Sequence, residues 1–198
     1  GYKLGIFGLI IVMGFNMGWT PYFLKRIKET GAKQEFSHIA SLFLGVLGFI
    51  VVMISIWLPE IMRLKIGSNY LIGDSFWSAD KVVSIVLISY FFFGTYVIQL
   101  PGVYAKEITV WIPIFRAIGA ISNISLNIIL IPKYGVLGSA WATTISFILM
   151  SLSVYIKLFN IYYVKYNFNA FFYPIVFMAI IFYPPQSVLA RVFIGFCY

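Results

Sequence analysis

Long apolar runs dominate the chain, and most charged residues fall between them. A helix needs about 20 apolar residues to cross a bilayer, and six stretches qualify: Leu4–Leu24, Ile39–Leu58, Val82–Leu100, Thr109–Ile131, Val136–Ile156 and Ala170–Tyr183, the last of them short. A seventh run, from Gln186 to Tyr198, is too short to cross. The pattern therefore predicts an all-α, polytopic transmembrane helical bundle with six complete spans and a truncated seventh.

Composition supports a bilayer environment and argues against disulfide and metal sites. The 198 residues are 62% hydrophobic and 10% charged, whereas soluble domains carry about 25% charged residues. The chain begins with Gly1 and ends within an apolar run, so we expect it to be a fragment. With one cysteine, Cys197, and one histidine, His38, an internal disulfide is excluded, and we expect neither a metal nor a cofactor.

Basic residues are distributed unevenly between the two ends of the predicted spans. One side carries eight, Lys25, Arg26, Lys28, Lys33, Lys106, Arg116, Lys157 and Lys165, and the other carries five, Lys3, Arg63, Lys65, Lys81 and Lys133. Cytoplasmic loops are enriched in Lys and Arg, so the first side is predicted to be cytoplasmic. Basic residues that orient the spans and contact anionic lipid headgroups are enough to explain the net charge of +8. Membrane lipids are therefore expected partners, and nucleic acid is not.

Acidic and nucleophilic motifs are sparse. The six acids, Glu29, Glu35, Glu60, Asp74, Asp80 and Glu107, all lie in predicted loops or at span ends. An ion relay normally needs a carboxylate within the membrane, and the sequence has neither a Gly-x-Ser-x-Gly elbow nor a phosphate-binding Gly-Lys-Ser/Thr loop. We therefore expect no enzyme. A membrane-bound polymerase or acyltransferase, the remaining enzymatic alternative, would need clustered catalytic groups.

Polar residues inside the spans follow a helical spacing. Arg116, Ala120, Asn123 and Asn127 are separated by four, three and four residues, which places them on one helix face. An intramembrane arginine favours a water-filled cavity, although Arg116 lies close enough to a span end to extend to the interface. The asparagines favour the cavity too, with interhelical hydrogen bonding as the alternative. Asn16 in the first span and Gln99 in the third span are polar residues that interrupt apolar runs in the same way. The candidate substrate-binding residues are therefore Arg116, Asn123, Asn127, Asn16 and Gln99.

The segment IPKYGVLG predicts a tight connection between two antiparallel spans. Pro132 should end one helix, while Gly135 and Gly138 permit a turn and a close approach. Gly138, Ala142 and Ser146 recur at every fourth position and form a small-residue face for helix packing.

The run NISLNIILIPKYGVLGSAWATTIS resembles the helical hairpin of the polysaccharide and O-antigen flippases. The matching residues are Asn123, Asn127, Pro132, Lys133, Tyr134, Gly135, Gly138, Ala140, Ala142 and Thr143, while Ser139 and Trp141 depart from the pattern. GWTPYFLK and GVYAKEITVW are similar to two further family segments, so the resemblance extends from Gly18 to about Lys157. It is specific at the hairpin and loose elsewhere.

This resemblance implies the multidrug/oligosaccharidyl-lipid/polysaccharide exporter superfamily, whose members place two helical lobes around a central cavity. Residues 1–198 would form the C-terminal transmembrane lobe. The implied activity is flipping of an undecaprenyl-pyrophosphate-linked oligosaccharide across a bacterial cytoplasmic (inner) membrane during O-antigen, capsule or exopolysaccharide synthesis. A polysaccharide polymerase and a chain-length regulator would be partners. A drug/cation antiporter and a peptidoglycan-precursor flippase of the same superfamily remain open alternatives.

Overall fold

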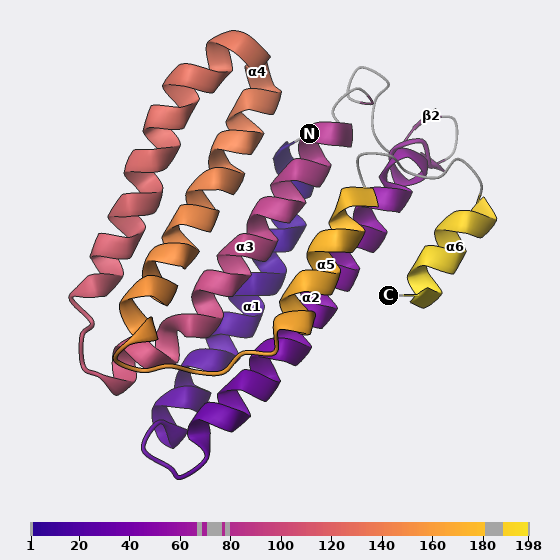
Figure 1. Cartoon of the computed structure of the whole chain (residues 1–198). Helices are drawn as coiled ribbons and strands as arrows, with labels where there is room; N and C mark the ends of the chain where they lie inside the picture. Colours follow the sequence, from indigo (N-terminus) through magenta and orange to yellow (C-terminus); the bar gives the residue numbers. More distant parts are fainter. Residues whose placement is uncertain (1, 67–68, 71–76, 78–79, 181–187, 198) are drawn as a thin grey trace.

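Six helices make up most of the part of the chain that the structure describes (Figure 1). The computed structural model describes residues 2–66, 69–70, 77, 80–180 and 188–197. The helices are α1 (Tyr2–Arg26), α2 (Ala32–Met62), α3 (Asp80–Ala105), α4 (Trp111–Phe159), α5 (Phe168–Ile180) and α6 (Val188–Cys197). Strands β1 (Lys65–Ile66) and β2 (Asn69–Tyr70) form one antiparallel pair. The predicted all-α class is confirmed, with this two-residue strand pair as its one addition among the described residues.

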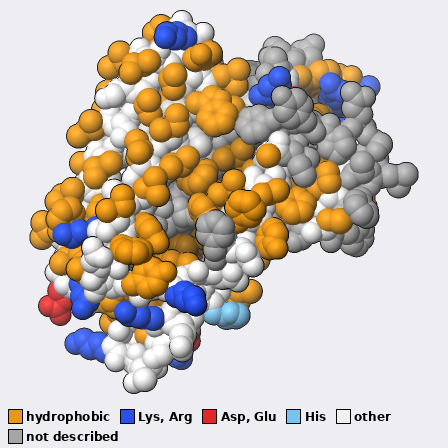
Figure 2. Space-filling model, in the orientation of Figure 1, with side chains coloured by type: hydrophobic (Ala, Val, Ile, Leu, Met, Phe, Trp, Pro, Cys, Tyr) orange, Lys and Arg blue, Asp and Glu red, His pale blue; other side chains and the backbone are white. Residues whose placement is uncertain are grey.

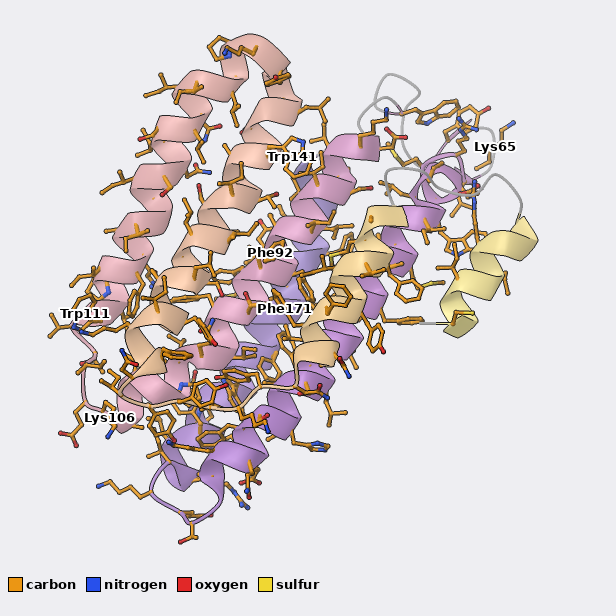
Figure 3. All side chains as sticks on the ribbon, viewed as in Figure 1. Lys65, Phe92, Lys106, Trp111, Trp141 and Phe171 are labelled. Carbon is orange, nitrogen blue, oxygen red and sulfur yellow. The ribbon has the colours of Figure 1, made fainter. Side chains whose placement is uncertain are left out.

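Helix α3 occupies the middle of the bundle. It packs against α1, α2 and α4, and nearly every side chain from Val82 to Val103 is buried. A helix that is apolar on all sides suits either the interior of a bundle or lipid, and here neighbouring helices surround α3. Short α5 covers α2, and its Phe171 lies against Phe92 of α3 with ring centroids 6.4 Å apart (Figure 3). The core therefore lies around α3.

Helix α4 folds back on itself. A straight helix of 49 residues would be about 74 Å long, more than twice the hydrocarbon thickness of about 30 Å. The backbone reverses at Gly135, whose φ of 57° and ψ of −134° are not helical, and the two arms run side by side (Figure 1). We call residues 111–134 the first arm and 136–159 the second arm. Helical structure continues through Pro132, so the prediction that this proline ends the helix is wrong; the reversal takes place at Gly135.

The number of complete spans was overestimated. Four helices, α1 to α4, are long and apolar enough to cross a membrane, and the two arms of α4 correspond to the predicted fourth and fifth spans. The predicted sixth span, Ala170–Tyr183, is represented by the 13 residues of α5, about 20 Å of helix, and its last three positions lie outside the described residues. The prediction of six complete spans is therefore wrong for the described part of the chain, because Ala170–Tyr183 yields too short a helix.

The molecular surface is apolar over a broad area. Figure 2 shows hydrophobic side chains across most of the visible face, while Lys and Arg gather toward the end that carries the α1–α2 turn. Met17 of α1, Ile128 of the first arm and Ile156 of the second arm are all at least two-thirds exposed. Such a surface is suited to lipid or to another apolar partner, in agreement with a membrane protein.

Candidate functional site

Asn123 lies at the contact between the two arms of the hairpin, and Asn127 bonds to Asn123. Asn123 Nδ2 donates a hydrogen bond to Thr143 Oγ1 at 3.3 Å. Asn127 Nδ2 donates to the carbonyl oxygen of Asn123 at 2.8 Å and to Asn123 Oδ1 at 3.0 Å. Both side chains are half-buried. The bond from Asn123 to Thr143 joins the two arms and is interhelical, as the alternative reading of the amides expects, whereas the bonds of Asn127 stay within the first arm.

Arg116 lies apart from this pair. It is exposed on the first arm, five residues after Trp111, and no described residue forms an ion pair with it. Seven residues separate it from Asn123, about 10 Å along a helix. Lys157 places its Nζ 3.8 Å from the centre of the Trp111 ring, so the two arms end together there. Figure 3 shows Trp111 and Lys106 at this same end. The structure thus separates Arg116 from the amides along the arm.

Asn16 and Gln99 occupy different surroundings. Asn16 is half-buried on α1, and its Oδ1 accepts a hydrogen bond from Thr20 Oγ1 at 3.2 Å. Gln99 is buried on α3, 6% exposed, where it contacts the second arm of α4. The five predicted substrate-binding residues therefore do not converge on one site within the described residues.

The small hairpin residues lie where packing was predicted. Gly138 and Ala142 are buried, and a Cβ added to Gly138 would lie 2.4 Å from the Leu130 carbonyl oxygen. Gly119 approaches Met150 of the second arm. The close approach of the arms at Gly138 therefore leaves no room for a side chain.

A buried polar cluster joins α3 to the second arm of α4. Gln99 Nε2 donates to the Thr95 carbonyl oxygen at 2.7 Å, to Ser151 Oγ at 2.9 Å and to the Ser151 carbonyl oxygen at 3.3 Å. The hydroxyls of Thr95 and Ser151 are 2.7 Å apart. In contrast, Gln99 Oε1 is buried and accepts no hydrogen bond from any described residue. Because a carbonyl oxygen can only accept a hydrogen bond, the amide nitrogen of Gln99 rather than its oxygen faces the two carbonyl groups, and the oxygen is left as an unused acceptor.

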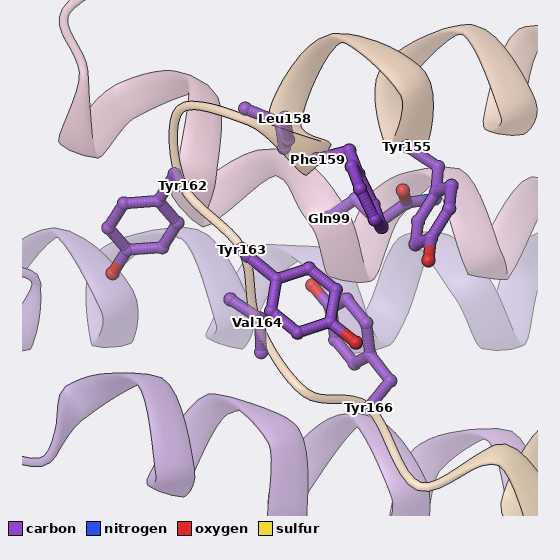
Figure 4. Close-up of a pocket in the computed structure, with 8 residues that line it drawn as sticks. All are labelled: Gln99, Tyr155, Leu158, Phe159, Tyr162, Tyr163, Val164 and Tyr166. Carbon is purple, nitrogen blue, oxygen red and sulfur yellow. The ribbon is translucent and has the colours of Figure 1, made fainter.

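Next to this cluster lies a cavity of about 430 Å³. Its walls come from α2, α3, the second arm, α5 and the extended segment 160–167, which we call the strap. A smaller pocket of about 10 Å³, drawn in Figure 4, adjoins it and shares Gln99, Tyr155, Tyr163, Val164 and Tyr166 with it. Figure 4 shows Tyr163 and Tyr166 beneath Gln99 and Tyr155 where the strap crosses the helices.

The strap is tied down by contacts at several positions. Tyr166 Oη donates to the Ile98 carbonyl oxygen at 3.4 Å, and Ser37 Oγ donates to the Lys165 carbonyl oxygen at 2.7 Å. Lys33 Nζ lies 4.5 Å from the centre of the Tyr162 ring. Burial raises the pKa of Tyr166, and the nearby Tyr162 adds to this shift. Two of the strap tyrosines, Tyr163 and Tyr166, thus form part of a cavity wall.

Among residues with defined positions, no group of three His, Cys, Asp or Glu side chains could hold a metal ion. No family model, no curated protein and no solved structure matches the chain.

Proposed function

We propose that this chain is the C-terminal transmembrane lobe of a flippase for undecaprenyl-pyrophosphate-linked oligosaccharides in a bacterial inner membrane. The proposal rests on the resemblance of the hairpin sequence to that of the polysaccharide and O-antigen flippases. One structural observation gives it the most support. The guanidinium group of Arg116 is exposed on the outer side of the first arm, within an otherwise apolar stretch of helix.

Arg116 is placed where an anionic group could reach it. It lies about 7.5 Å along the helix from Trp111, near the membrane end. The cost of about 2.5–3.5 kcal/mol for an arginine at the centre of a membrane helix therefore does not apply in full, and the side chain can also extend to the interface. A pyrophosphate at this depth would suit the guanidinium group, which binds phosphate oxygens through two parallel, charge-assisted hydrogen bonds.

The arrangement of the first arm supports a cavity on this side. The first arm contacts the second arm through Gly119 and Asn123, while Ala120, on the same side as Arg116, is exposed. In a two-lobed flippase the opposite lobe would face this exposed side and enclose a cavity with Arg116 on its wall. A polysaccharide polymerase and a chain-length regulator would then act on the translocated product.

The acidic residues also favour an anionic or neutral substrate over a cation. Within the described helices the acids occupy only terminal turns, Glu35 and Glu60 in α2 and Asp80 in α3. A drug/cation antiporter would be expected to carry a carboxylate within a span.

The test is a complementation strain that carries the complete gene with Arg116→Ala, Arg116→Lys or Lys106→Ala. We expect Arg116→Ala to abolish surface polysaccharide at a normal membrane protein level, and Arg116→Lys to restore part of it, because lysine keeps the charge and loses the bidentate geometry. Lys106, an exposed loop residue at the same end, is the matched control for loss of one positive charge, and Lys106→Ala should export normally.

Two results would contradict the substrate role. One is full export by Arg116→Ala. The other is an equal loss of surface polysaccharide in Arg116→Ala and Lys106→Ala, with a lower membrane protein level in both. That result would show that Arg116 affects only membrane insertion and orientation. Immunoblots of surface polysaccharide and of membrane protein distinguish these results.

A further inference from the structure

We propose that Lys33 of α2 and Lys165 of the strap together bind the phosphate group of one anionic phospholipid. Basic residues at the cytoplasmic end of a membrane protein attract anionic headgroups in general, whereas the strap contacts assign a defined site to these two lysines. Arg116 takes no part in this site, so the proposal does not depend on the flippase function.

Two contacts hold the strap against the start of α2 and bring the lysines together. Lys33 Nζ lies 4.5 Å from the centre of the Tyr162 ring. Ser37, one helical turn after Lys33, donates a hydrogen bond from its Oγ to the Lys165 carbonyl oxygen at 2.7 Å. One helical turn is about 5.4 Å, and a lysine carries its charge on a flexible four-carbon stem. The two ammonium groups can therefore converge on one phosphate.

Neither lysine has an acidic partner in the part of the chain that the structure describes. Both are exposed, and neither takes part in an ion pair. Glu29 and Glu35, the acids nearest to them in the sequence, are bound to Arg26 at 3.5 Å and 3.3 Å. Neighbouring charges of the same sign repel each other. An anionic group between the two lysines would therefore be attracted by both and would remove their repulsion.

The ammonium group of Lys33 is positioned before any ligand arrives. The ring of Tyr162 beneath it is buried, and a Cβ added to Gly102 of α3 would lie 3.1 Å from that ring. A cation over a ring face is attracted by the ring electrons, while its three N–H donors remain able to bond to oxygen. Lys33 therefore loses little side-chain freedom when it binds a phosphate oxygen.

Exposed apolar side chains beside the lysines favour a phospholipid over a soluble anion. Ile161 and Tyr163 of the strap are 40% and 48% exposed, and Figure 2 shows hydrophobic side chains that reach the basic end of the molecule. A phospholipid can place its phosphate on the lysines and its acyl chains on this apolar surface. A free phosphate would use the lysines alone.

Native mass spectrometry of the protein, expressed from its complete gene and kept in detergent, tests the site. The added lipids are dimyristoyl-phosphatidylglycerol and dimyristoyl-phosphatidylcholine, which have the same acyl chains and differ in net charge. The test variant carries Lys33→Gln and Lys165→Gln. The matched control carries Lys25→Gln and Lys28→Gln, which removes two exposed positive charges from the same end of the molecule.

We expect the parent protein to bind its first phosphatidylglycerol about thirty-fold more tightly than its first phosphatidylcholine, which corresponds to about 1 kcal/mol for each lysine. The test variant should bind the two lipids equally, and the control should keep a preference of about ten-fold or more. Lys33→Arg with Lys165→Arg should also keep the preference, because both charges are retained.

An equal loss of preference in the test variant and the control would overturn the proposal, because net charge alone would then attract the lipid. Displacement of phosphatidylglycerol by excess inorganic phosphate would also overturn it, since the occupant would then be a soluble anion. Lys165→Gln alone keeps the backbone contact with Ser37 and guards against misfolding of the double variant. It should weaken phosphatidylglycerol binding about five-fold, and unchanged binding would refute the site. These readouts measure lipid binding alone, so their failure would leave the Arg116 experiment unaffected.

Discussion

Replacement of Gly138 by alanine places a methyl group against the backbone of the opposite arm of α4. An added Cβ would lie 2.4 Å from the Leu130 carbonyl oxygen, 2.6 Å from the Leu130 carbonyl carbon and 3.1 Å from the Ile131 nitrogen. These are backbone atoms and cannot rotate away, so the arms must separate by about 1 Å to restore normal contact distances. Overpacking costs about 1–3 kcal/mol, and alanine regains up to about 1 kcal/mol of helix propensity. We expect a net loss of about 1–2 kcal/mol in the free energy of unfolding.

The assay is unfolding in mixed micelles by increasing mole fractions of SDS, followed by far-ultraviolet circular dichroism. Gly14→Ala is the matched control, because a Cβ at Gly14 of α1 has no atom within 4 Å. That variant should be as stable as the parent or up to about 1 kcal/mol more stable. If Gly138→Ala unfolds at the same SDS fraction as Gly14→Ala, the reasoning about backbone contact in the hairpin is refuted.

Three further outcomes are expected. Gly135→Ala should lower the free energy of unfolding by about 1–3 kcal/mol in the same titration, because a side chain is strained at φ 57° and ψ −134°; an unchanged midpoint would contradict this. Burial raises the pKa of Tyr166, so the folded state holds this proton more strongly than the unfolded state. Stability should be constant below the ordinary tyrosine pKa of about 10 and fall as the pH rises above it, and Tyr166→Phe should show a smaller fall between pH 10 and 11. Cysteines at Lys33 and Lys165, which the strap contacts bring to one end of the molecule, should react with an impermeant maleimide only from the cytoplasm. A cysteine at Lys133, beside the hairpin turn, should react only from outside; the predicted external position Asp74 lies outside the described residues.

The predicted spans locate the first three helices closely, but each helix is longer than its apolar run. Ile39–Leu58 became Ala32–Met62, for example, with Lys33 and Glu35 in its first turn. Hydropathy marks the part of a helix that lipid or core surrounds, whereas the backbone hydrogen bonds that define the helix continue through charged residues. Helix ends are therefore less predictable than helix centres.

The hairpin shows how far helical spacing can be taken. Spacing alone places Arg116, Asn123 and Asn127 on one face of the first arm, yet Arg116 is exposed and Asn123 is hydrogen-bonded to the second arm. The contact between the arms passes from Gly119, beside Met150, to Asn123 at the middle of the first arm, beside Thr143. Two helices that cross touch along a line that moves around each of them. One face therefore meets different surroundings along its length.

By itself the amino-acid sequence determined that this protein is built from long apolar helices, where the first three of them lie, and that a close turn joins the two arms of α4 near Gly135 and Gly138. These features depend on local properties, namely runs of apolar side chains and glycines at positions that a side chain cannot occupy. Only the tertiary structure decided that Gln99 meets Ser151, 52 residues away, and that the strap closes a cavity beside them. Such a site depends on side chains from five segments of the chain, and it exists only because the packing of the helices brings those segments to one place.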